Sequence, residues 1–250
     1  MMDTILQKLL PMQPLASVEG RDNDTLMYLI HGLVLILFIG WAIYFIFVLI
    51  KFRQTRNSKA VLSHKPHQIS SYVEWVVVAV EFLLLFAFSI PFWAVHQAGM
   101  PTGKNVMEVR VVAQQFAWNV HYAGPDGRFG HASARFLNDN PLGLDPNDPD
   151  GKDDITTMNQ IYLPVNKPVI ISLTSKDVIH SFGVPAMRVK QDIIPGMTTH
   201  VWFTPNKIGQ YEVACSQLCG SGHYRMRGVI NVLSQSDFDQ WIQQNRGIHD

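Results

Sequence analysis

The only two cysteines of the chain lie in a short segment that reads ACSQLCGSGHYRMRG. Within twelve residues this segment holds two thiols, an imidazole and a thioether: Cys215, Cys219, His223 and Met226. Such soft ligands select copper over magnesium, calcium or manganese. The residue types and their spacing therefore predict a copper site in this segment.

Two other uses of the cysteines are open at this point. A disulfide would suit an exported protein, but a bridge between residues four apart closes a ring too small for much entropic gain. Zinc would be satisfied by two cysteines and two histidines in a tetrahedral site. A mononuclear blue-copper site needs only one cysteine, which leaves the second surplus unless two metals share both sulfurs.

A cupredoxin-type site usually draws one histidine from a distant strand, and His180 is the best candidate. It lies in SKDVIHSFGVPAM, after an apolar strand and before a turn with Gly and Pro. Alone, a histidine at such a position is more often a partly buried residue than a ligand. The thiol-rich segment reverses that preference, so His180 joins the predicted ligands.

The residues around these candidates have the composition of β-strands. Four segments are short, rich in Val, Ile and Tyr, and separated by Pro, Gly and Asn turns. They read VMEVRVVAQQFAWNV, QIYLPVNKPVIISLTS, THVWFTPNKIGQYEVAC and RGVINVL. Strands at this spacing predict an all-β, cupredoxin-like Greek-key sandwich over residues 98–235. Residues 236–250 are expected to form a short surface helix, Ser236 to Arg246, and a tail.

The composition of the whole chain points to a membrane protein. It has 250 residues, 47% of them hydrophobic and only 16% charged, with 20 basic against 20 acidic side chains. Roughly 25% charged residues is usual in soluble domains. This balance argues against a nucleic-acid binder, a disordered protein and a highly soluble cytosolic enzyme.

Two apolar runs predict transmembrane helices over residues 26–50 and 73–97. A helix over the first run is about 37 Å long at 1.5 Å per residue, enough to cross a hydrocarbon core of roughly 30 Å. No comparable run follows Ala98. The sequence thus predicts a helical hairpin followed by one exported domain.

The loop between the spans, residues 51–72, sets the expected orientation. It carries five bases and no acid: Lys51, Arg53, Arg56, Lys59 and Lys65. The positive-inside rule places this loop in the cytoplasm and both termini outside. Residues 1–25 are then an exported leader, although removal of part of it stays open. Pro11 and Pro14 interrupt its short apolar stretch and argue against a signal peptide.

An insertion over residues 124–154 holds seven aspartates: Asp126, Asp139, Asp145, Asp148, Asp150, Asp153 and Asp154. Its run DPNDPDGKDD resembles a calcium loop, but the prolines and the missing terminal glutamate break that pattern. Steering of a basic partner is a second interpretation. A solvated insertion with no specific role is the third.

Glu74 and Glu81 lie inside the second apolar run, seven residues apart. Two helical turns put them on one face about 10 Å apart along the axis. Ionisable groups in a span usually face protein or water and mark function. For Glu74, near the cytoplasmic end, an interfacial anchor is the plainer alternative.

Two spans followed by an exported β-sandwich resemble subunit II of the haem-copper cytochrome c oxidases. The cysteine segment resembles that family's C-x-x-x-C-x-x-x-H-x-x-M signature, and DVIHSFGVPAMRVKQDIIPG is a second long match. The resemblance implies two copper ions in a binuclear centre, bridged by the sulfurs of Cys215 and Cys219. The other ligands that it implies are His180, His223, Met226 and the backbone carbonyl of Gln217.

The function implied by this resemblance is the acceptance of electrons from a c-type cytochrome donor. The electrons then pass to haem in subunit I, where oxygen is reduced to water with proton pumping. Subunit III and membrane lipid are further expected partners, nucleic acid is not, and a bacterial plasma membrane is favoured. The alternatives are a copper-containing nitric oxide reductase subunit and a membrane-anchored copper carrier.

Two positions depart from the family pattern. Most members have glutamate where this chain has Gln217, which keeps the carbonyl for copper but puts magnesium binding at the subunit I interface in doubt. Phe116 replaces the first tryptophan of a W-x-W run, where electrons enter from cytochrome c, and Trp118 matches the second. Both aromatics could equally be core residues.

Two acidic residues also match family positions. Glu74 matches a glutamate at the mouth of a proton channel into subunit I. Glu81 has no assigned counterpart and is expected to donate a hydrogen bond to that subunit in its protonated form. Asp192 matches an aspartate near the subunit interface, with a simple turn cap as the alternative.

Overall fold

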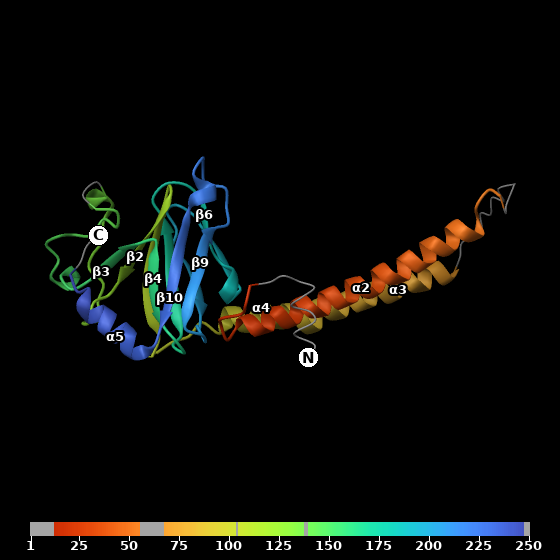
Figure 1. The fold of residues 1–250 in the computed structure, drawn as a ribbon, viewed down its shortest axis with the longest axis horizontal. Coiled ribbons are helices and arrows are strands. Elements are labelled where there is room, and N and C mark those ends of the chain that lie inside the picture. Colours follow the sequence, from red (N-terminus) through yellow and green to blue (C-terminus); the bar gives the residue numbers. More distant parts are fainter. Residues whose placement is uncertain (1–12, 56–67, 104, 138–139, 248–250) are drawn as a thin grey trace. The chain divides into compact units, whose positions relative to one another are not determined.

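The computed structural model describes residues 13–55, 68–103, 105–137 and 140–247. They form two compact units, each drawn in Figure 1. One unit contains residues 22–99 and is helical. The other joins residues 13–21 to the chain from residue 100 onward and is built of β-strands.

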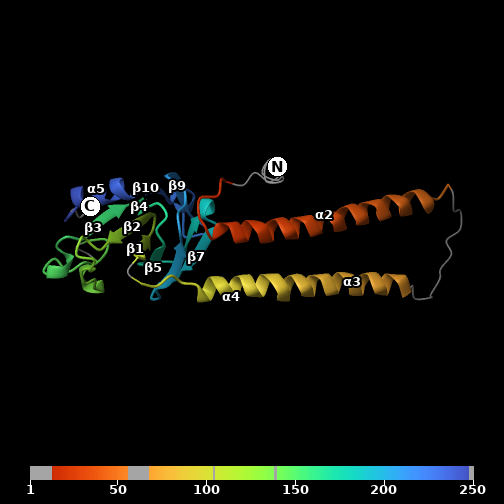
Figure 2. The same cartoon turned by 90° about the horizontal axis from the view of Figure 1, so that it is seen from below.

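The helical unit consists of two long apolar helices, as the sequence predicts. Helix α2 spans Gly20–Lys51, and the second helix comprises α3 (Gln68–Leu84), the π-helical segment η1 (Leu85–Ser89) and α4 (Ile90–Ala98). The two run in opposite directions (Figure 2). The most apolar 18-residue window has a mean hydropathy of 3.0 in Gly20–Lys51 and 2.3 in Ser71–Val95, and no residue of either window is buried. Apolar surface of this extent is suited to lipid rather than water.

The π-helical segment has a local cause. Pro91 lies two residues after its end and lacks the N–H that would bond to the preceding turn. A wider turn before the proline lets the remaining N–H groups find carbonyl partners, so the helix continues to Ala98. The expected second span therefore forms without a break.

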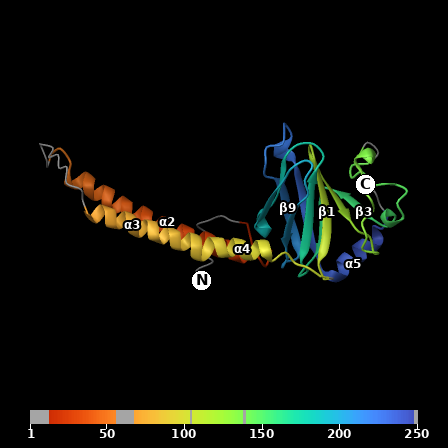
Figure 3. The same cartoon turned by 180° about the vertical axis from the view of Figure 1, so that it is seen from behind.

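The β unit is a sandwich of two five-stranded sheets (Figure 3). One sheet has the order β3-β2-β1-β5-β8 and the other β4-β10-β9-β6-β7. The strands are β1 (Met107–Gln114), β2 (Ala117–Tyr122), β3 (Ile155–Met158), β4 (Gln160–Pro164), β5 (Val169–Ser175), β6 (His180–Val184), β7 (Val189–Ile193), β8 (Thr199–Phe203), β9 (Gly209–Cys215) and β10 (Arg227–Leu233). Both sheets are mixed, because β1 runs parallel to β5 and β10 parallel to β4.

Alternating side chains of the strands build the core. Val109, Val111 and Ala113 of β1 point inward and are buried. Strand β2 is buried on both faces. Full burial of a large apolar side chain contributes about 1.5–3 kcal/mol, so inward residues of this kind hold the two sheets together.

Part of the expected leader is packed into the β unit. Ala16 and Ser17 are fully buried, and the Ser17 hydroxyl donates to the carbonyl of Met187 over 2.8 Å. The carboxylate of Glu19 accepts hydrogen bonds from both the backbone N–H and the hydroxyl of Thr204, each at 2.8 Å. The segment from residue 13 thus serves the β fold, which the sequence pattern did not indicate.

The acidic insertion covers the outer face of β2. His121 on that face is buried, and its Nε2 lies 2.6 Å from Oδ2 of the fully buried Asp154. Asp154 also accepts the N–H of Gly130 at 2.8 Å. Asp154 is therefore buried, whereas a solvated insertion with no specific role would leave it exposed to water.

Other aspartates of the insertion accept hydrogen bonds from backbone N–H groups within the insertion. Asp126, Asp145 and Asp148 each accept a backbone N–H two residues onward. Asp148 also accepts the N–H of His131, and these two bonds, that from His131 first, lower its pKa below the ordinary value. Among the described residues no carboxylate cluster suited to a metal ion occurs in the insertion, and Asp139 lies outside them.

The final helix α5 spans Gln235–Gln244 and closes the β unit. Ser234 caps it by accepting the N–H of Asp237. Trp241 stacks on Tyr162 of β4 with ring centroids 4.4 Å apart, and Phe238 is buried. The helix is therefore fixed to the sandwich by its aromatic face.

Candidate metal centre

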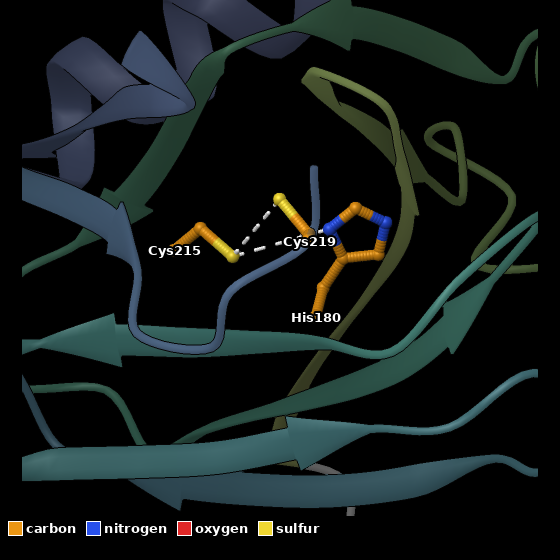
Figure 4. A group of neighbouring side chains, drawn as sticks. All are labelled: His180, Cys215 and Cys219. Carbon is orange, nitrogen blue, oxygen red and sulfur yellow. Dashed lines mark hydrogen bonds between the residues drawn. The ribbon is translucent and has the colours of Figure 1, made fainter. Parts of the chain in front are cut away.

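The predicted soft ligands meet at one end of the sandwich. His180 Nδ1, Cys215 Sγ and Cys219 Sγ all lie within 4.8 Å of one another and point toward a common centre (Figure 4). Cys215 Sγ is 3.9 Å from His180 Nδ1 and 3.8 Å from Cys219 Sγ. All three side chains are buried.

The remaining three predicted donors complete the group. The carbonyl oxygen of Gln217 is 3.1 Å from Cys215 Sγ. His223 Nδ1 is 3.7 Å and Met226 Sδ 3.8 Å from Cys219 Sγ. Each sulfur therefore has one histidine nitrogen and one weaker donor beside it.

Neighbouring strands of one sheet position these ligands. His180 begins β6 and Cys215 ends β9, and the two strands pair through Phe182 and Cys215. The loop after β9 then turns back, and its end is fixed because the N–H of Cys215 donates to the carbonyl of Met226 at 3.1 Å. Residues 35 positions apart in the chain thus share one site.

Both cysteines are free thiols. Burial, followed by the hydrogen bond and charge of the neighbouring Cys215, raises the pKa of Cys219 to about 11. The Cys219 thiol is therefore protonated at neutral pH without a metal, and a metal ion must displace this proton to bind its sulfur. Metal binding at Cys219 is expected to strengthen as the pH rises toward that pKa.

The donor set fits copper better than structural zinc. A structural zinc site is closed by four strong ligands, usually thiolate or imidazole. This group offers six donors, and its thioether is a soft ligand that copper accepts. Four donors around two central sulfurs would also suit two metals that share both sulfurs.

Asp177 and Gln115 brace the site, and neither was identified from the sequence. Asp177 Oδ1 lies 2.8 Å from His180 Nε2, which leaves Nδ1 free to face the sulfurs. Asp177 Oδ2 accepts the N–H of Gln115 at 2.7 Å, and the Gln115 side chain donates to the carbonyl of Cys219 at 2.7 Å. One network therefore joins a histidine ligand to the cysteine loop.

Hydrogen bonding keeps Asp177 ionised. Partial burial alone would raise its pKa. The hydrogen bonds from His180 and from the N–H groups of Gln115 and Val178 outweigh that effect and lower the pKa below its usual value. A carboxylate that fixes the tautomer and orientation of a ligating histidine is a common feature of metal sites. The position of Asp177, three residues before His180, is the one sequence signal that could have identified this role.

Replacement of Asp177 by alanine is expected to lower copper affinity about 10–100-fold, the usual effect of losing a residue that orients a ligand. His180 would keep its place in β6 but lose the partner that fixes its ring. Competition with a copper chelator would measure the affinity. Asp177→Asn, which keeps an acceptor oxygen, should lose less. Equal affinities of wild type and Asp177→Ala would show that Asp177 does not orient His180.

The two aromatic candidates occupy different places. Phe116 is half-buried, and its ring packs on the ligand loop: a Cβ at Gly220 would lie 3.2 Å from it, and one at Gly222 would overlap it. Trp118 is 0% exposed, with its ring centroid 5.6 Å from Phe182 and 6.4 Å from His180. Trp118 is therefore a core residue behind the site and cannot contact an external donor.

The three acidic candidates, all within the described chain, contribute no atom to the group of donors. Glu74 and Glu81 are both on α3 and exposed within the described chain. Asp192 of β7 accepts the hydroxyl of Ser181, next to His180, at 2.7 Å. That bond and one from Lys190 lower the pKa of Asp192 below its ordinary value. The Gln217 residue is exposed, while its carbonyl faces Cys215.

Comparison with known proteins identifies close similarities. Residues 107–233, from the first residue of β1 to the last of β10, match the family model described as cytochrome c oxidase subunit II, periplasmic domain. The alternative cytochrome c oxidase subunit 2 of Bradyrhizobium diazoefficiens is 32% identical over 93% of this chain and 83% of its own length. The cytochrome c oxidase subunit 2 of Cereibacter sphaeroides is 28% identical over 89% of this chain and 77% of its own length.

Among solved structures, the periplasmic domain of subunit II of cytochrome oxidase of Bradyrhizobium japonicum is also similar. It is 29% identical in sequence, with a TM-score of 0.43. The match covers 58% of this chain and 96% of that domain.

Proposed function

Because the chain belongs to the cytochrome c oxidase subunit II family, we propose that it accepts single electrons from a c-type cytochrome and passes them to haem in subunit I. Oxygen is reduced to water there, with proton pumping, and this chain performs no oxygen chemistry. It is one subunit of a haem-copper terminal oxidase. Subunit III and membrane lipid are its further partners.

The observation that supports this role most strongly is the group of six donors, in which four surround two buried free thiols. His180, Cys215, Gln217, Cys219, His223 and Met226 would hold two copper ions. When bound, such a pair would supply a one-electron redox centre in which the charge is shared, so that the metal–ligand bonds would change little on reduction. The chain's own contribution is rigidity: Asp177 orients His180, and Gln115 fixes the Cys219 carbonyl.

The two aromatic residues would contribute to electron entry in different ways. Phe116 is the surface contact, because its half-buried ring lies on the glycines of the ligand loop. Trp118 contributes from behind by packing against His180.

The bacterial relatives support a bacterial plasma membrane, and the basic loop between the helices supports a copper domain on its periplasmic side. The two apolar helices would span the bilayer over residues 26–50 and 73–97, joined by the basic cytoplasmic loop 51–72. Residues 98–235 then form the copper domain, and Glu74 would lie at the cytoplasmic mouth of a proton channel. Residues 1–25 and 236–250 are the leader and the tail on the exported side.

Electron paramagnetic resonance of the full chain, purified in detergent and loaded with copper, tests the proposal. A mixed-valence pair gives seven hyperfine lines, because one electron couples equally to two copper nuclei. A four-line spectrum, or no bound copper, would contradict the binuclear centre. In the complete oxidase, reduced cytochrome c should drive oxygen uptake, and nitric oxide consumption in its place would contradict the terminal oxidase role.

Gln217→Glu is expected to add magnesium or manganese to the oxidase without loss of copper. The carbonyl at position 217 faces Cys215 and is unchanged, while the new side chain supplies the carboxylate that hard cations prefer. Metal analysis of the purified complex measures both ions. Gln243→Glu, an exposed change of the same charge on α5, is the control. Unchanged magnesium and manganese in Gln217→Glu would refute this explanation of the departure.

A further inference from the structure

Asn159 is the single residue between β3, which belongs to one sheet, and β4, which belongs to the other. Its backbone is left-handed, with a φ of 60°. Asparagine tolerates this conformation better than most residues that have a side chain. The chain therefore crosses between the two sheets through one residue whose side chain can still form hydrogen bonds.

Asn159 forms hydrogen bonds to a strand of each sheet. Its backbone N–H donates to the carbonyl of Trp118 in β2, and its Oδ1 accepts the N–H of Trp118, both at 2.8 Å. The carbonyl of Asn159 accepts the N–H of Val229 in β10 at 2.9 Å. Because β2 and β10 belong to different sheets, Asn159 ties the two sheets together at this point.

Gly228 of β10 allows the strands to approach closely beside Asn159. A Cβ at position 228 would lie 3.0 Å from the carbonyl oxygen of Asn159 and 3.1 Å from Cδ1 of Trp118. Both distances are shorter than ordinary van der Waals contact between carbon or oxygen atoms. We call Asn159, Trp118, Gly228 and Val229 the sheet junction.

The sheet junction holds the start of β10, which directly follows Met226. The carbonyl of Met226 accepts the N–H of Cys215 at 3.1 Å, and three residues further along Val229 donates to Asn159. The Met226 side chain is 1% exposed, and its Sδ lies 3.8 Å from Cys219 Sγ. The position of this thioether therefore depends on two attachments, one of which is Asn159.

Trp118 connects the same junction to His180. Its ring is fully buried, with its centroid 6.4 Å from that of His180, and its Cδ1 faces Gly228. Asn159 holds the backbone of Trp118 at both its N–H and its carbonyl. The ring thus packs against a predicted ligand on one side and against β10 on the other.

We propose that Asn159 is a positioning residue for the copper centre: it holds Trp118 and β10 so that the Met226 thioether stays in the donor group. This inference rests on the proposed function, because it concerns copper bound to that group. A thioether is a soft ligand that favours reduced copper, and such a weak ligand tunes the reduction potential of cupredoxin sites. Loss of the Asn159 side chain should therefore loosen Met226 and lower the reduction potential.

Asn159→Gly tests the side chain alone, because glycine keeps the left-handed backbone. We expect the preference for the reduced state to fall about tenfold, which for one electron is about 59 mV. Spectroelectrochemical titration of the full chain, in detergent and loaded with copper, measures this shift. Asn166→Gly is the matched control: Asn166 also has a φ of 60°, in the β4–β5 turn at the opposite end of the sandwich. Its potential should equal that of wild type.

Methyl NMR spectra of isotopically labelled methionine provide a readout in the metal-free chain. Met226→Leu assigns the signal of Met226. Asn159→Gly should shift or broaden this signal, and Asn166→Gly should leave it unchanged. Asn159→Asp keeps an oxygen that accepts the N–H of Trp118, so it should return the signal to its wild-type position. A residue that only stabilises the fold would give the same spectrum in both glycine variants.

Gly228→Ala tests the junction from β10 while the Asn159 side chain stays intact. The added methyl group would press on the Asn159 carbonyl and on Trp118, so β10 should move and the potential should fall. Gly228→Ala combined with Asn159→Gly should lower the potential by less than the sum of the two single shifts, because both changes act through the same displacement.

Three results would overturn the inference. They are an unchanged Met226 signal in Asn159→Gly, a shifted signal with an unchanged potential, and equal potential shifts in Asn159→Gly and Asn166→Gly. If wild type lacks the seven-line copper signal, the proposed function fails, while the metal-free spectra still show whether Asn159 positions Met226. Every variant of Asn159, Asn166 and Gly228 should keep the seven-line signal, because none of these residues contributes a donor atom.

Discussion

Cys215→Ser is expected to abolish the seven-line copper signal and electron transfer from the donor without unfolding the β unit. The Cys215 sulfur is the centre of the cluster, 3.8 Å from Cys219 Sγ, 3.9 Å from His180 Nδ1 and 3.1 Å from the Gln217 carbonyl. A serine hydroxyl is a harder ligand and cannot bridge two copper ions as a thiolate does. The loss of copper affinity should exceed the about 10–100-fold effect of removing a residue that only orients a ligand.

Stability should change little in this variant. Serine is close to cysteine in size, and its hydroxyl can donate a hydrogen bond to the carbonyl oxygen of Gln217. Circular dichroism on heating should therefore show a metal-free unfolding free energy within about 1 kcal/mol of wild type. Ser221→Ala, an exposed change in the same loop, is the control and should keep the copper signal. A seven-line signal in Cys215→Ser would refute the bridging role.

Trp118→Ala is expected to destabilise the β unit by about 3–5 kcal/mol, the usual cost of replacing a buried tryptophan by alanine. The side chain is 0% exposed and packs edge-on against Phe182 and His180. The cavity left behind would lie next to a predicted copper ligand, so copper occupancy should fall as well. Chemical denaturation followed by fluorescence, together with copper analysis, measures both losses.

Trp118→Phe separates packing from electron transfer. The Trp118 indole N–H is buried without a hydrogen-bond partner among the described residues, so phenylalanine sacrifices no such bond. A hydrophobic replacement of this kind usually costs less than about 1.5 kcal/mol. We expect the copper signal to persist and the rate from the donor to stay near that of wild type, whereas Phe116→Ala should slow it. A large rate loss in Trp118→Phe with intact copper would instead make the indole an obligatory electron carrier.

Local sequence patterns predicted the fold class and the ligand loop. Two uninterrupted apolar runs predict long membrane helices, because a hydrocarbon core requires consecutive apolar residues. Alternating Val and Ile predict strands with one buried face, as in β1. Cys215, Cys219, His223 and Met226 lie in one loop, so their spacing alone indicated a shared site. The family model and the structure confirm the two apolar helices and the sandwich.

Contacts between distant segments could not be predicted in this way. Gln115 forms a hydrogen bond with Cys219, 104 positions away in the sequence. Glu19 forms one with Thr204, 185 positions away. The short strands β3, β6 and β7 carry polar residues and lack the apolar pattern of their neighbours. Their pairing becomes favourable only when an adjacent strand offers its N–H and C=O groups.

The sequence by itself determined which side chains are available to bind a metal and which segments are apolar enough to cross a membrane. Ligand types and hydropathy are properties of consecutive residues, so the copper loop and the membrane helices can be read directly along the chain. Only the tertiary structure decided that Asp177 orients His180, that Asp154 is buried against His121, and that Trp118 lies behind the site. The physical reason is that burial and hydrogen-bond partners depend on which strands and loops meet, and no local period in the sequence records that arrangement.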